Sequence, residues 1–231
     1  MDVSVVIPAL NEEKYIRYPM SGLEKQTFAG FETIVVDGRS EDKTRNIARR
    51  FAKVIVTDKK GVSAARNIGA AAAKGKLIIF IDSDTFPSEN LIESYLSAFA
   101  DRKVVAATGP IYPIENGKLL DMGYILISKY FVRISILFGK PCIVGSNFAV
   151  RASALRKSGG FDENLVTYED WELSNRLKKY GKIRYVESAY VRTSARRVIL
   201  WGMWRYFMYY LINVVMYNLF KKSMSNYKKI R

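Results

Sequence analysis

Residues 77–84 read Leu-Ile-Ile-Phe-Ile-Asp-Ser-Asp. An apolar run is followed at once by two carboxylates with one residue between them. An uninterrupted run of this kind predicts a strand buried on both faces, as in a parallel sheet. The carboxylates then lie where the strand leaves the sheet. Aspartate is also common in ordinary turns, so residues 82–84 by themselves fit a solvated turn as well as they fit a binding site.

Similar strands recur on both sides of this stretch. We expect strands at 3–7, 31–36, 54–56, 77–81 and 104–108, with helices at 13–25, 42–51, 63–73 and 88–100 between them. Strands that alternate with helices at this spacing predict an α/β fold with a mostly parallel sheet and right-handed crossovers. The second half is less regular. There we expect helices at 118–138, 169–180 and 201–220 and strands at 142–150 and 185–191.

Three carboxylates, Asp37, Asp82 and Asp84, lie at predicted strand ends. Ligands of open α/β sheets bind beyond the carboxyl ends of the strands, so these side chains share one rim. Paired carboxylates suit Mg²⁺ or Mn²⁺, which leave coordination positions for substrate phosphates. Asp37 fits either a contact to a nucleoside or a turn that caps the next helix.

The composition limits which catalytic and metal-binding groups the chain can use. The 231 residues carry a net charge of +15 and include no histidine and one cysteine, Cys142. Histidine-dependent triads and dyads and histidine-ligated metals are therefore excluded, and any base must be Asp, Glu, Lys or Tyr. A single cysteine excludes an intramolecular disulfide and fits a reducing compartment.

Two helix starts add candidates. Lys60-Gly61 precedes the helix that carries Arg66, where backbone N–H groups and basic side chains would face phosphate. Glu169-Asp170 opens a later helix and offers a general base. Each also has a purely structural interpretation, namely a capped helix with basic surface residues and an acidic helix start.

Six motifs then occur in one order, at residues 5–13, 35–40, 61–69, 80–84, 145–151 and 159–172. Together they resemble the family 2 glycosyltransferases, inverting enzymes with the glycosyltransferase A-type (GT-A) fold. The resemblance runs from about residue 3 to residue 177. It implies one Rossmann-like nucleotide-diphospho-sugar transferase domain at 1–195, followed by a C-terminal helical segment at 196–231.

The resemblance also implies roles for matching residues. Asp170 matches the catalytic base, with Glu169 beside it. Asp84 would hold the Mn²⁺ or Mg²⁺ on the donor diphosphate, with Asp82 on its metal or ribose side. The residues implied to bind the nucleotide-sugar are Pro8, Leu10, Glu12, Asp37, Lys60, Arg66, Asp82, Ser83, Gly145, Ser146 and Asn147.

Two departures from the family pattern matter. The second motif, often Asp-Asp-Gly-Ser, here reads Val36-Asp37-Gly38-Arg39-Ser40, which leaves one acid. The Gln-x-x-Arg-Trp motif of processive synthases is absent, and Arg196-Arg197 with Trp201 does not match it. A polymerising enzyme is therefore the less favoured interpretation.

The C-terminal segment carries much of the basic excess. No acidic residue follows Glu187, and 201–220 is apolar and rich in Trp and Tyr, with lysines directly after it. Aromatic and basic residues together favour an interfacial membrane helix. A single span, a dimer-forming helix and a core-covering helix are the alternatives. Residues 118–138 would either join this surface or pack over the acceptor cleft.

These features predict an enzyme that moves a sugar from a UDP- or GDP-sugar to a polyprenyl phosphate or glycolipid. With no apparent signal peptide, we expect a cytoplasmic location, peripheral on the inner face of the cell membrane. The alternatives are a soluble or polysaccharide acceptor, a sugar nucleotidyltransferase, and a non-catalytic nucleic-acid-binding protein. The expected partners are the donor, a lipid-linked or glycan acceptor and the membrane, without nucleic acid.

Overall fold

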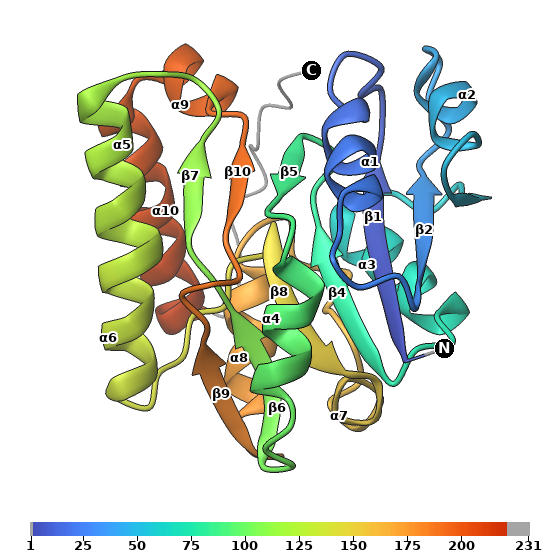
Figure 1. Ribbon diagram of the computed structural model, residues 1–231. Helices are drawn as coiled ribbons and strands as arrows, with labels where there is room; N and C mark the ends of the chain where they lie inside the picture. Colours follow the sequence, from blue (N-terminus) through green and yellow to red (C-terminus); the bar gives the residue numbers. More distant parts are fainter. Residues whose placement is uncertain (1, 221–231) are drawn as a thin grey trace.

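The computed structural model describes residues 2–220, and only the backbone at 207, 211, 214, 215 and 218. The main sheet has the strand order β3-β2-β1-β4-β8-β6-β9 (Figure 1). Its strands are β1 (Val3–Ala9), β2 (Phe31–Asp37), β3 (Lys53–Val56), β4 (Leu77–Ile81), β6 (Val104–Thr108), β8 (Asn147–Arg151) and β9 (Lys182–Tyr185). β8 runs antiparallel to β4 and β6, and the other neighbours pair in parallel. The predicted α/β fold with a mostly parallel sheet is confirmed.

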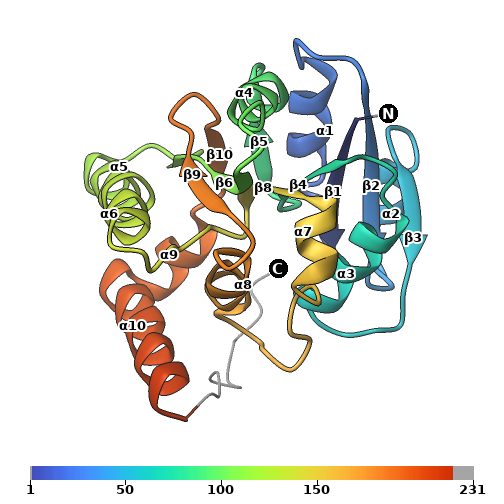
Figure 2. The same cartoon turned by 90° about the horizontal axis from the view of Figure 1, so that it is seen from below.

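Helices cover both faces of this sheet (Figure 2). α1 (Arg17–Glu24) and α4 (Leu91–Ala98) lie on one side, and α3 (Val62–Ala72), α7 (Ala152–Lys157) and α8 (Glu169–Leu177) on the other. Successive residues of β1 enter opposite cores: Val5 packs in the core that contains Tyr95, and Val6 in the core that contains Phe148. Burial on both faces explains why these strands are continuous apolar runs.

A second, smaller sheet was not predicted. It joins β5 (Thr85–Pro87), β10 (Val191–Thr193) and β7 (Ile111–Pro113) in that order. β5 follows Asp84 directly and pairs antiparallel with β10. The backbone N–H of Ser194 also donates to the Asp84 carbonyl at 3.1 Å. This small sheet therefore brings the C-terminal part of the chain to the rim that carries Asp84.

The helices of the second half outside these two layers stand together at one side of the molecule (Figures 1 and 2). α5 (Lys118–Tyr124), a π-helical stretch (Ile125–Phe131) and α6 (Val132–Leu137) follow without a break, as predicted for 118–138. α9 (Arg196–Trp201) and α10 (Met203–Phe220) lie beside them, separated from each other by Gly202 with φ 79°. Within residues 2–220, no helix combines the length and hydropathy needed to cross a membrane. The lysines expected at the membrane after residue 220 lie outside the described residues.

Two predicted strands are wrong in their bounds. The strand expected at 185–191 is divided between the end of β9 and the start of β10, because the chain turns between them. At that turn the Ala189 carbonyl lies against Gly109, where a Cβ would meet it at 1.9 Å. The strand expected at 142–150 begins only at Asn147, because side chains take the preceding backbone N–H groups: Ser135 accepts from Cys142, and Ser174 from Ile143.

Two early helices are shorter than predicted. The helix expected at 13–25 begins at Arg17, and that expected at 42–51 is reduced to α2 (Thr44–Ala48). The chain ahead of α1 forms a turn in which the N–H groups of Tyr15 and Ile16 both donate to the Glu12 carbonyl. The backbone N–H groups of Asn11, Glu12 and Glu13 donate across to Ser40, Thr44 and Asp42 and so join the loops after β1 and β2.

Candidate active site

The two carboxylates that follow β4 lie in different surroundings. The Asp82 side chain is 36% exposed and accepts a hydrogen bond from Nη2 of Arg66 at 3.0 Å. Asp84 is 16% exposed, with Oδ1 at 3.3 Å from the Thr193 hydroxyl and Oδ2 at 3.2 Å from Arg196. Burial, and then the charge of Asp82, raises the pKa of Asp84 to about 7, against the attraction of Arg196. Ser83 between them is buried.

Arg66 of α3 connects Asp82 to Glu169, the neighbour of the predicted base Asp170. Its guanidinium is buried and donates from Nη1 to Glu169 at 2.8 Å and from Nη2 to both Asp82 and the Gly145 carbonyl. A Cβ on Gly145 would approach Arg66 Nη2 to 2.7 Å, so this contact needs a glycine. Arg66 therefore joins the end of β4 to the start of α8.

Glu169 and Asp170 are adjacent at the start of α8 but have different partners. Glu169 is buried against Arg66, and burial followed by the charge of Asp170 raises its pKa to about 7. Asp170 accepts backbone hydrogen bonds from Gly145 and Trp171, both at 2.8 Å. Burial raises the pKa of Asp170, and the positive charge of Arg66 opposes that shift. The carboxylate of Asp170 is thus fixed beside the loop at 145–146.

The residues expected around the nucleotide lie at the ends of β1 and β2. Asp37 has no exposed surface; its Oδ2 accepts from Ser40 and Arg45, and its Oδ1 has no hydrogen-bond partner within residues 2–220. Pro8 is buried in β1, and Leu10 is half-buried beside Gly38. Lys60 is exposed in the loop before α3. The structure thus groups these β1 and β2 residues and leaves Lys60 on the surface.

Asn147, expected at the donor sugar, is fully enclosed in the protein. Its Oδ1 accepts from the Tyr95 hydroxyl at 2.7 Å, and its Nδ2 donates to the carbonyls of Pro110 and Ala189. With no exposed surface, Asn147 holds the loop that carries Gly145 and Ser146 rather than facing an open site. Ser146 remains half-buried.

Arg196 is the main site residue whose position the sequence did not predict. From the start of α9 it donates to Oε1 of Glu12 at 2.6 Å and contacts Asp84. Glu115 fixes the preceding residues by accepting from the Ser194 hydroxyl and the Ala195 N–H, both at 2.7 Å. Only the acid-free run after Glu187 hinted at this, because it leaves the arginines there without nearby acids in the sequence.

The carboxylates after β4 fit a divalent cation. Asp82 and Asp84 offer the hard oxygen ligands that Mg²⁺ and Mn²⁺ prefer, and Oε2 of nearby Glu12 is buried without a partner in the described part of the chain. Residues 2–220 contain no group of three or more acidic or cysteine side chains that could bind a metal ion without a substrate. Two carboxylates fit a cation that completes its coordination on substrate phosphates.

Comparison with known proteins identifies the family. A family model described as "Glycosyl transferase family 2" matches residues 4–159. The chain belongs to glycosyl transferase family 2. Among curated relatives, the family member described as the probable glycosyltransferase YdaM of Bacillus subtilis is 31% identical over 223 residues, covering 87% of this chain and 52% of its own length. The minor teichoic acid biosynthesis protein GgaA of the same organism is 30% identical, covering 78% of this chain and 45% of its own. This chain spans about half the length of these two relatives.

Solved structures show the same fold. S. aureus TarS 1–349 in complex with UDP-GlcNAc has a TM-score of 0.69 at 23% identity, covering 85% of this chain and 59% of its own. The mannosyltransferase PcManGT of Pyrobaculum calidifontis, in complex with GDP-Man and Mn²⁺, has a TM-score of 0.67 at 18% identity, covering 83% of this chain and 56% of its own. The family therefore shares with this chain the GT-A fold expected from the sequence.

Proposed function

We propose that the chain is the catalytic part of an inverting glycosyltransferase that moves a sugar from a nucleoside-diphosphate sugar to an acceptor. One observation carries the proposal: Arg66 joins Asp82, at the end of β4, to Glu169, next to Asp170, across the carboxyl ends of the strands. Donor-side and base-side carboxylates then meet at one crevice, where ligands of α/β sheets bind. The family match and the UDP-GlcNAc complex of TarS support a nucleotide-sugar donor.

In this proposal the nucleoside lies over the ends of β1 and β2. Leu10 would border that nucleoside, with Pro8 buried beneath it in β1. Asp37 has no exposed surface, so it would act by holding the loop after β2 through the N–H of Ser40 and the side chain of Arg45. Lys60 would approach the phosphates from the loop before α3. Whether the nucleotide is UDP or GDP is a question for binding measurements with both.

Asp84, with Asp82, would hold Mn²⁺ or Mg²⁺ against the donor diphosphate. The bound cation would supply charge stabilisation to the diphosphate as it leaves the anomeric carbon. The Mn²⁺ in the PcManGT complex supports a divalent cation. Arg66 is buried and its Nη groups are bound to Glu169, Asp82 and the Gly145 carbonyl, so we assign it to positioning these groups.

Asp170 is the proposed general base. Its carboxylate, oriented by the N–H groups of Gly145 and Trp171, would take the proton of the acceptor hydroxyl as that oxygen attacks the sugar from the face opposite the diphosphate. Attack from the opposite face inverts the anomeric configuration. Ser146, half-buried beside Gly145, would border the donor sugar.

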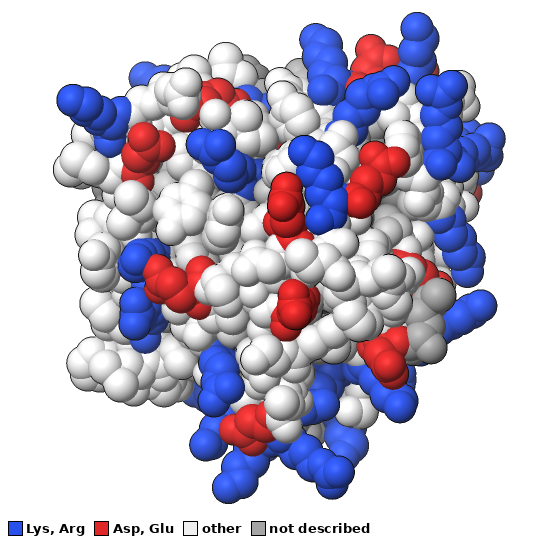
Figure 3. All heavy atoms as spheres, viewed as in Figure 1, with Lys and Arg blue, Asp and Glu red and all other residues white. Residues whose placement is uncertain are grey.

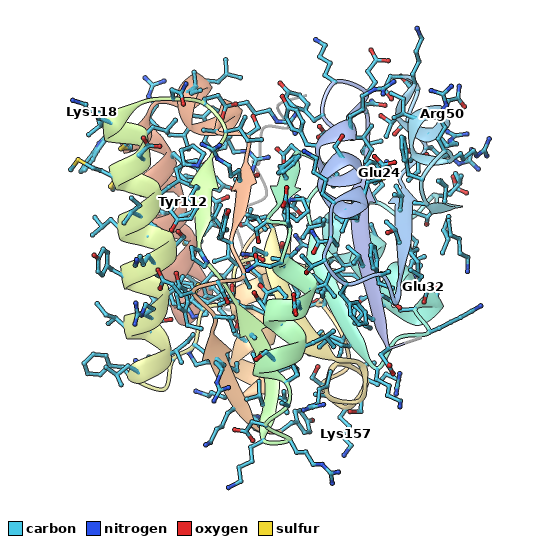
Figure 4. All side chains as sticks on the ribbon, viewed as in Figure 1. Glu24, Glu32, Arg50, Tyr112, Lys118 and Lys157 are labelled. Atoms are coloured by element: carbon cyan, nitrogen blue, oxygen red, sulfur yellow. The ribbon has the colours of Figure 1, made fainter. Side chains whose placement is uncertain are left out.

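Sugar transfer or donor hydrolysis, measured with UDP- and GDP-sugars and Mn²⁺, tests these assignments. We expect Asp170→Asn to lower kcat about a hundredfold or more, because general-base catalysis is lost. Asp84→Ala should remove the dependence on Mn²⁺ together with most of the activity. Glu24→Gln, which neutralises an exposed acid on α1 (Figure 4), is the control. Full activity in both site variants would overturn the assignment.

We further propose that the acceptor is presented at a membrane. Large exposed apolar side chains gather on the helices at 118–138 and 196–220, including Leu119, Met122, Leu126, Leu137, Phe138, Leu200 and Trp204. The edge of the molecule over α5 and α6 carries few charges in Figure 3, and Lys118 stands at its outer corner (Figure 4). Apolar patches of this kind mark interaction surfaces, and flanking basic residues favour anionic lipid. A polyprenyl phosphate or glycolipid acceptor at the inner face of the cell membrane fits this surface, and the relation to GgaA, a minor teichoic acid biosynthesis protein, supports a glycan acceptor.

Co-sedimentation with vesicles tests the membrane surface. We expect binding to anionic vesicles to fall about tenfold or more in Leu126→Ser/Leu137→Ser, because two exposed leucines leave the lipid. Val56→Ser, at an exposed apolar residue of β3, is the matched control. If the wild-type protein does not bind vesicles, and elutes as a dimer that the double variant disrupts, the surface is a contact with a second copy of the chain. A soluble or polysaccharide acceptor would then be favoured.

A further inference from the structure

The first turn of α9 places a cation against the proposed metal ligand. Nη2 of Arg196 lies 2.6 Å from Oε1 of Glu12 and 3.2 Å from Oδ2 of Asp84, and its guanidinium lies 4.3 Å from the centre of the Tyr15 ring. The three partners come from the loop after β1 and from the rim after β4. Arg196 therefore bridges two parts of the donor site.

This position is built into the fold. Glu115 accepts from the hydroxyl of Ser194 and the N–H of Ala195, and the Ser194 N–H donates to the Asp84 carbonyl. One guanidinium nitrogen, Nη1, is buried and has no hydrogen-bond partner among residues 2–220. The backbone before Arg196 is thus held in place, while its side chain keeps N–H groups for a ligand.

The contacts of Asp84 leave no oxygen unengaged. Oδ1 is within hydrogen-bond distance of Thr193, and Oδ2 pairs with Arg196, both at more than 3 Å. A Mg²⁺ or Mn²⁺ ion binds carboxylate oxygens at about 2.1 Å, so a cation on Oδ2 repels and displaces the guanidinium. The same cation brings a diphosphate, and arginine binds phosphate with short, charge-assisted and often paired hydrogen bonds.

We propose that Arg196 is a diphosphate-binding residue that occupies Asp84 while the site is empty and passes to the donor diphosphate when cation and donor bind together. The inference rests on the proposed function, since it takes Asp84 as the metal ligand. It has a thermodynamic consequence. Cation alone competes with Arg196 for Asp84, whereas cation with nucleotide gives Arg196 a new partner, so cation and nucleotide bind with positive coupling.

Direct binding measurements test this without relying on activity. Mn²⁺ binding is followed by electron paramagnetic resonance, and UDP and GDP binding, each with and without Mn²⁺, by calorimetry. We expect Arg196→Gln to bind Mn²⁺ alone several-fold more tightly and to bind the nucleoside diphosphate with Mn²⁺ about tenfold more weakly, since one charge-assisted contact is lost. Arg192→Gln, which removes the same charge from an exposed position on β10, should change neither affinity.

Arg196→Lys keeps the positive charge but loses the paired N–H groups of the guanidinium, so we expect its two affinities to lie between those of wild type and Arg196→Gln. Thermal unfolding of each variant checks that it is folded. If wild-type protein binds UDP or GDP with Mn²⁺ but Arg196→Gln matches it in either affinity, the inference is wrong and the proposed function stands. If wild-type protein binds neither nucleotide, the proposed function fails with it.

Discussion

Arg66 is a buried cation that pairs with two carboxylates from distant parts of the chain. Its Nη atoms contact Asp82 at 3.0 Å and Glu169 at 2.8 Å, and the guanidinium also lies over the Phe161 ring. Removing Arg66 would leave Glu169 buried without its cation, which costs free energy, whereas Asp82 is partly exposed and keeps access to water. The residue thus contributes to stability and to the geometry of the site at once.

We therefore predict that Arg66→Met lowers the free energy of unfolding by about 3–5 kcal/mol and abolishes measurable transfer. Arg66→Lys should retain the charge but bind one carboxylate at a time, so we expect a smaller loss of stability and a smaller loss of activity. Denaturant unfolding together with kcat measures both effects. An Arg66→Met variant as stable as wild type would contradict the burial argument.

The pair Glu169 and Asp170 sets the expected pH dependence. Burial and then the charge of Asp170 raise the pKa of Glu169 to about 7, and burial raises that of Asp170. Raised values mean that the pair takes up a proton at higher pH than ordinary carboxyls do. Since the base acts only when unprotonated, we predict that kcat with a hydroxyl acceptor falls as pH is lowered, and that this fall sets in at a higher pH than an ordinary aspartate would give.

Glu169→Gln supplies the check on that profile. It removes the neighbouring negative charge and frees Arg66 to favour the carboxylate of Asp170, so the midpoint should move to lower pH. Steady-state kcat across the pH range, with the same donor and acceptor, measures the shift. A midpoint that does not move would assign the titration to another group.

At the scale of elements, the start of α8 is held by α10. Tyr168, just before Glu169, has a left-handed backbone with φ 75°, which is unfavourable for a bulky residue. Its ring lies 5.0 Å from that of Trp171 and 4.6 Å from that of Tyr217 on α10. The Thr167 hydroxyl also donates to Asn213 at 2.9 Å. α10 thereby supports the backbone that carries the proposed base.

We predict that Tyr217→Ala lowers the free energy of unfolding by about 1–2 kcal/mol and reduces kcat more than it changes donor KM, because α8 loses its support while the nucleotide end is untouched. Tyr217→Phe keeps the ring and should resemble wild type. Thermal unfolding and steady-state kinetics measure the two effects. Equal loss in the Phe and Ala variants would point to the hydroxyl instead.

At the scale of the whole molecule, net charge and apolar surface act together. The chain carries +15, and exposed apolar residues gather on the α5–α6 and α9–α10 side. Each basic residue near an anionic surface contributes about 1 kcal/mol, and salt screens that attraction. Apolar insertion does not depend on salt in this way.

We predict that affinity for anionic vesicles weakens by about tenfold or more between roughly 0.05 and 0.5 M salt, whereas binding to neutral vesicles is weak throughout. Co-sedimentation at each salt concentration is the measurement. Affinity for anionic vesicles that stays constant would assign the surface to apolar contacts alone.

The proposed transferase domain at 1–195 depends on the C-terminal segment for its site. Arg196, the first residue of that segment, contacts Glu12 and Asp84 and so completes the site. The helical segment that follows contacts Thr167 and Tyr168, just before α8, through Asn213 and Tyr217. A truncation at residue 195 would remove a site residue together with the expected membrane helix.

The succession of buried strands and helices could be predicted from the amino-acid pattern, and with it the rim on which Asp37, Asp82 and Asp84 lie. Apolar periodicity is local, and parallel strands place their carboxyl ends at one edge, so a pattern along the chain suffices. The contacts between side chains could not be predicted in this way. Arg66 with Glu169, Arg196 with Asp84, and Asn147 with Tyr95 are pairs separated by 52 to 112 residues, and the sheet of β5, β7 and β10 joins segments that are also far apart in the chain. Such contacts follow from how the packed elements close on one another, a property that no local pattern contains.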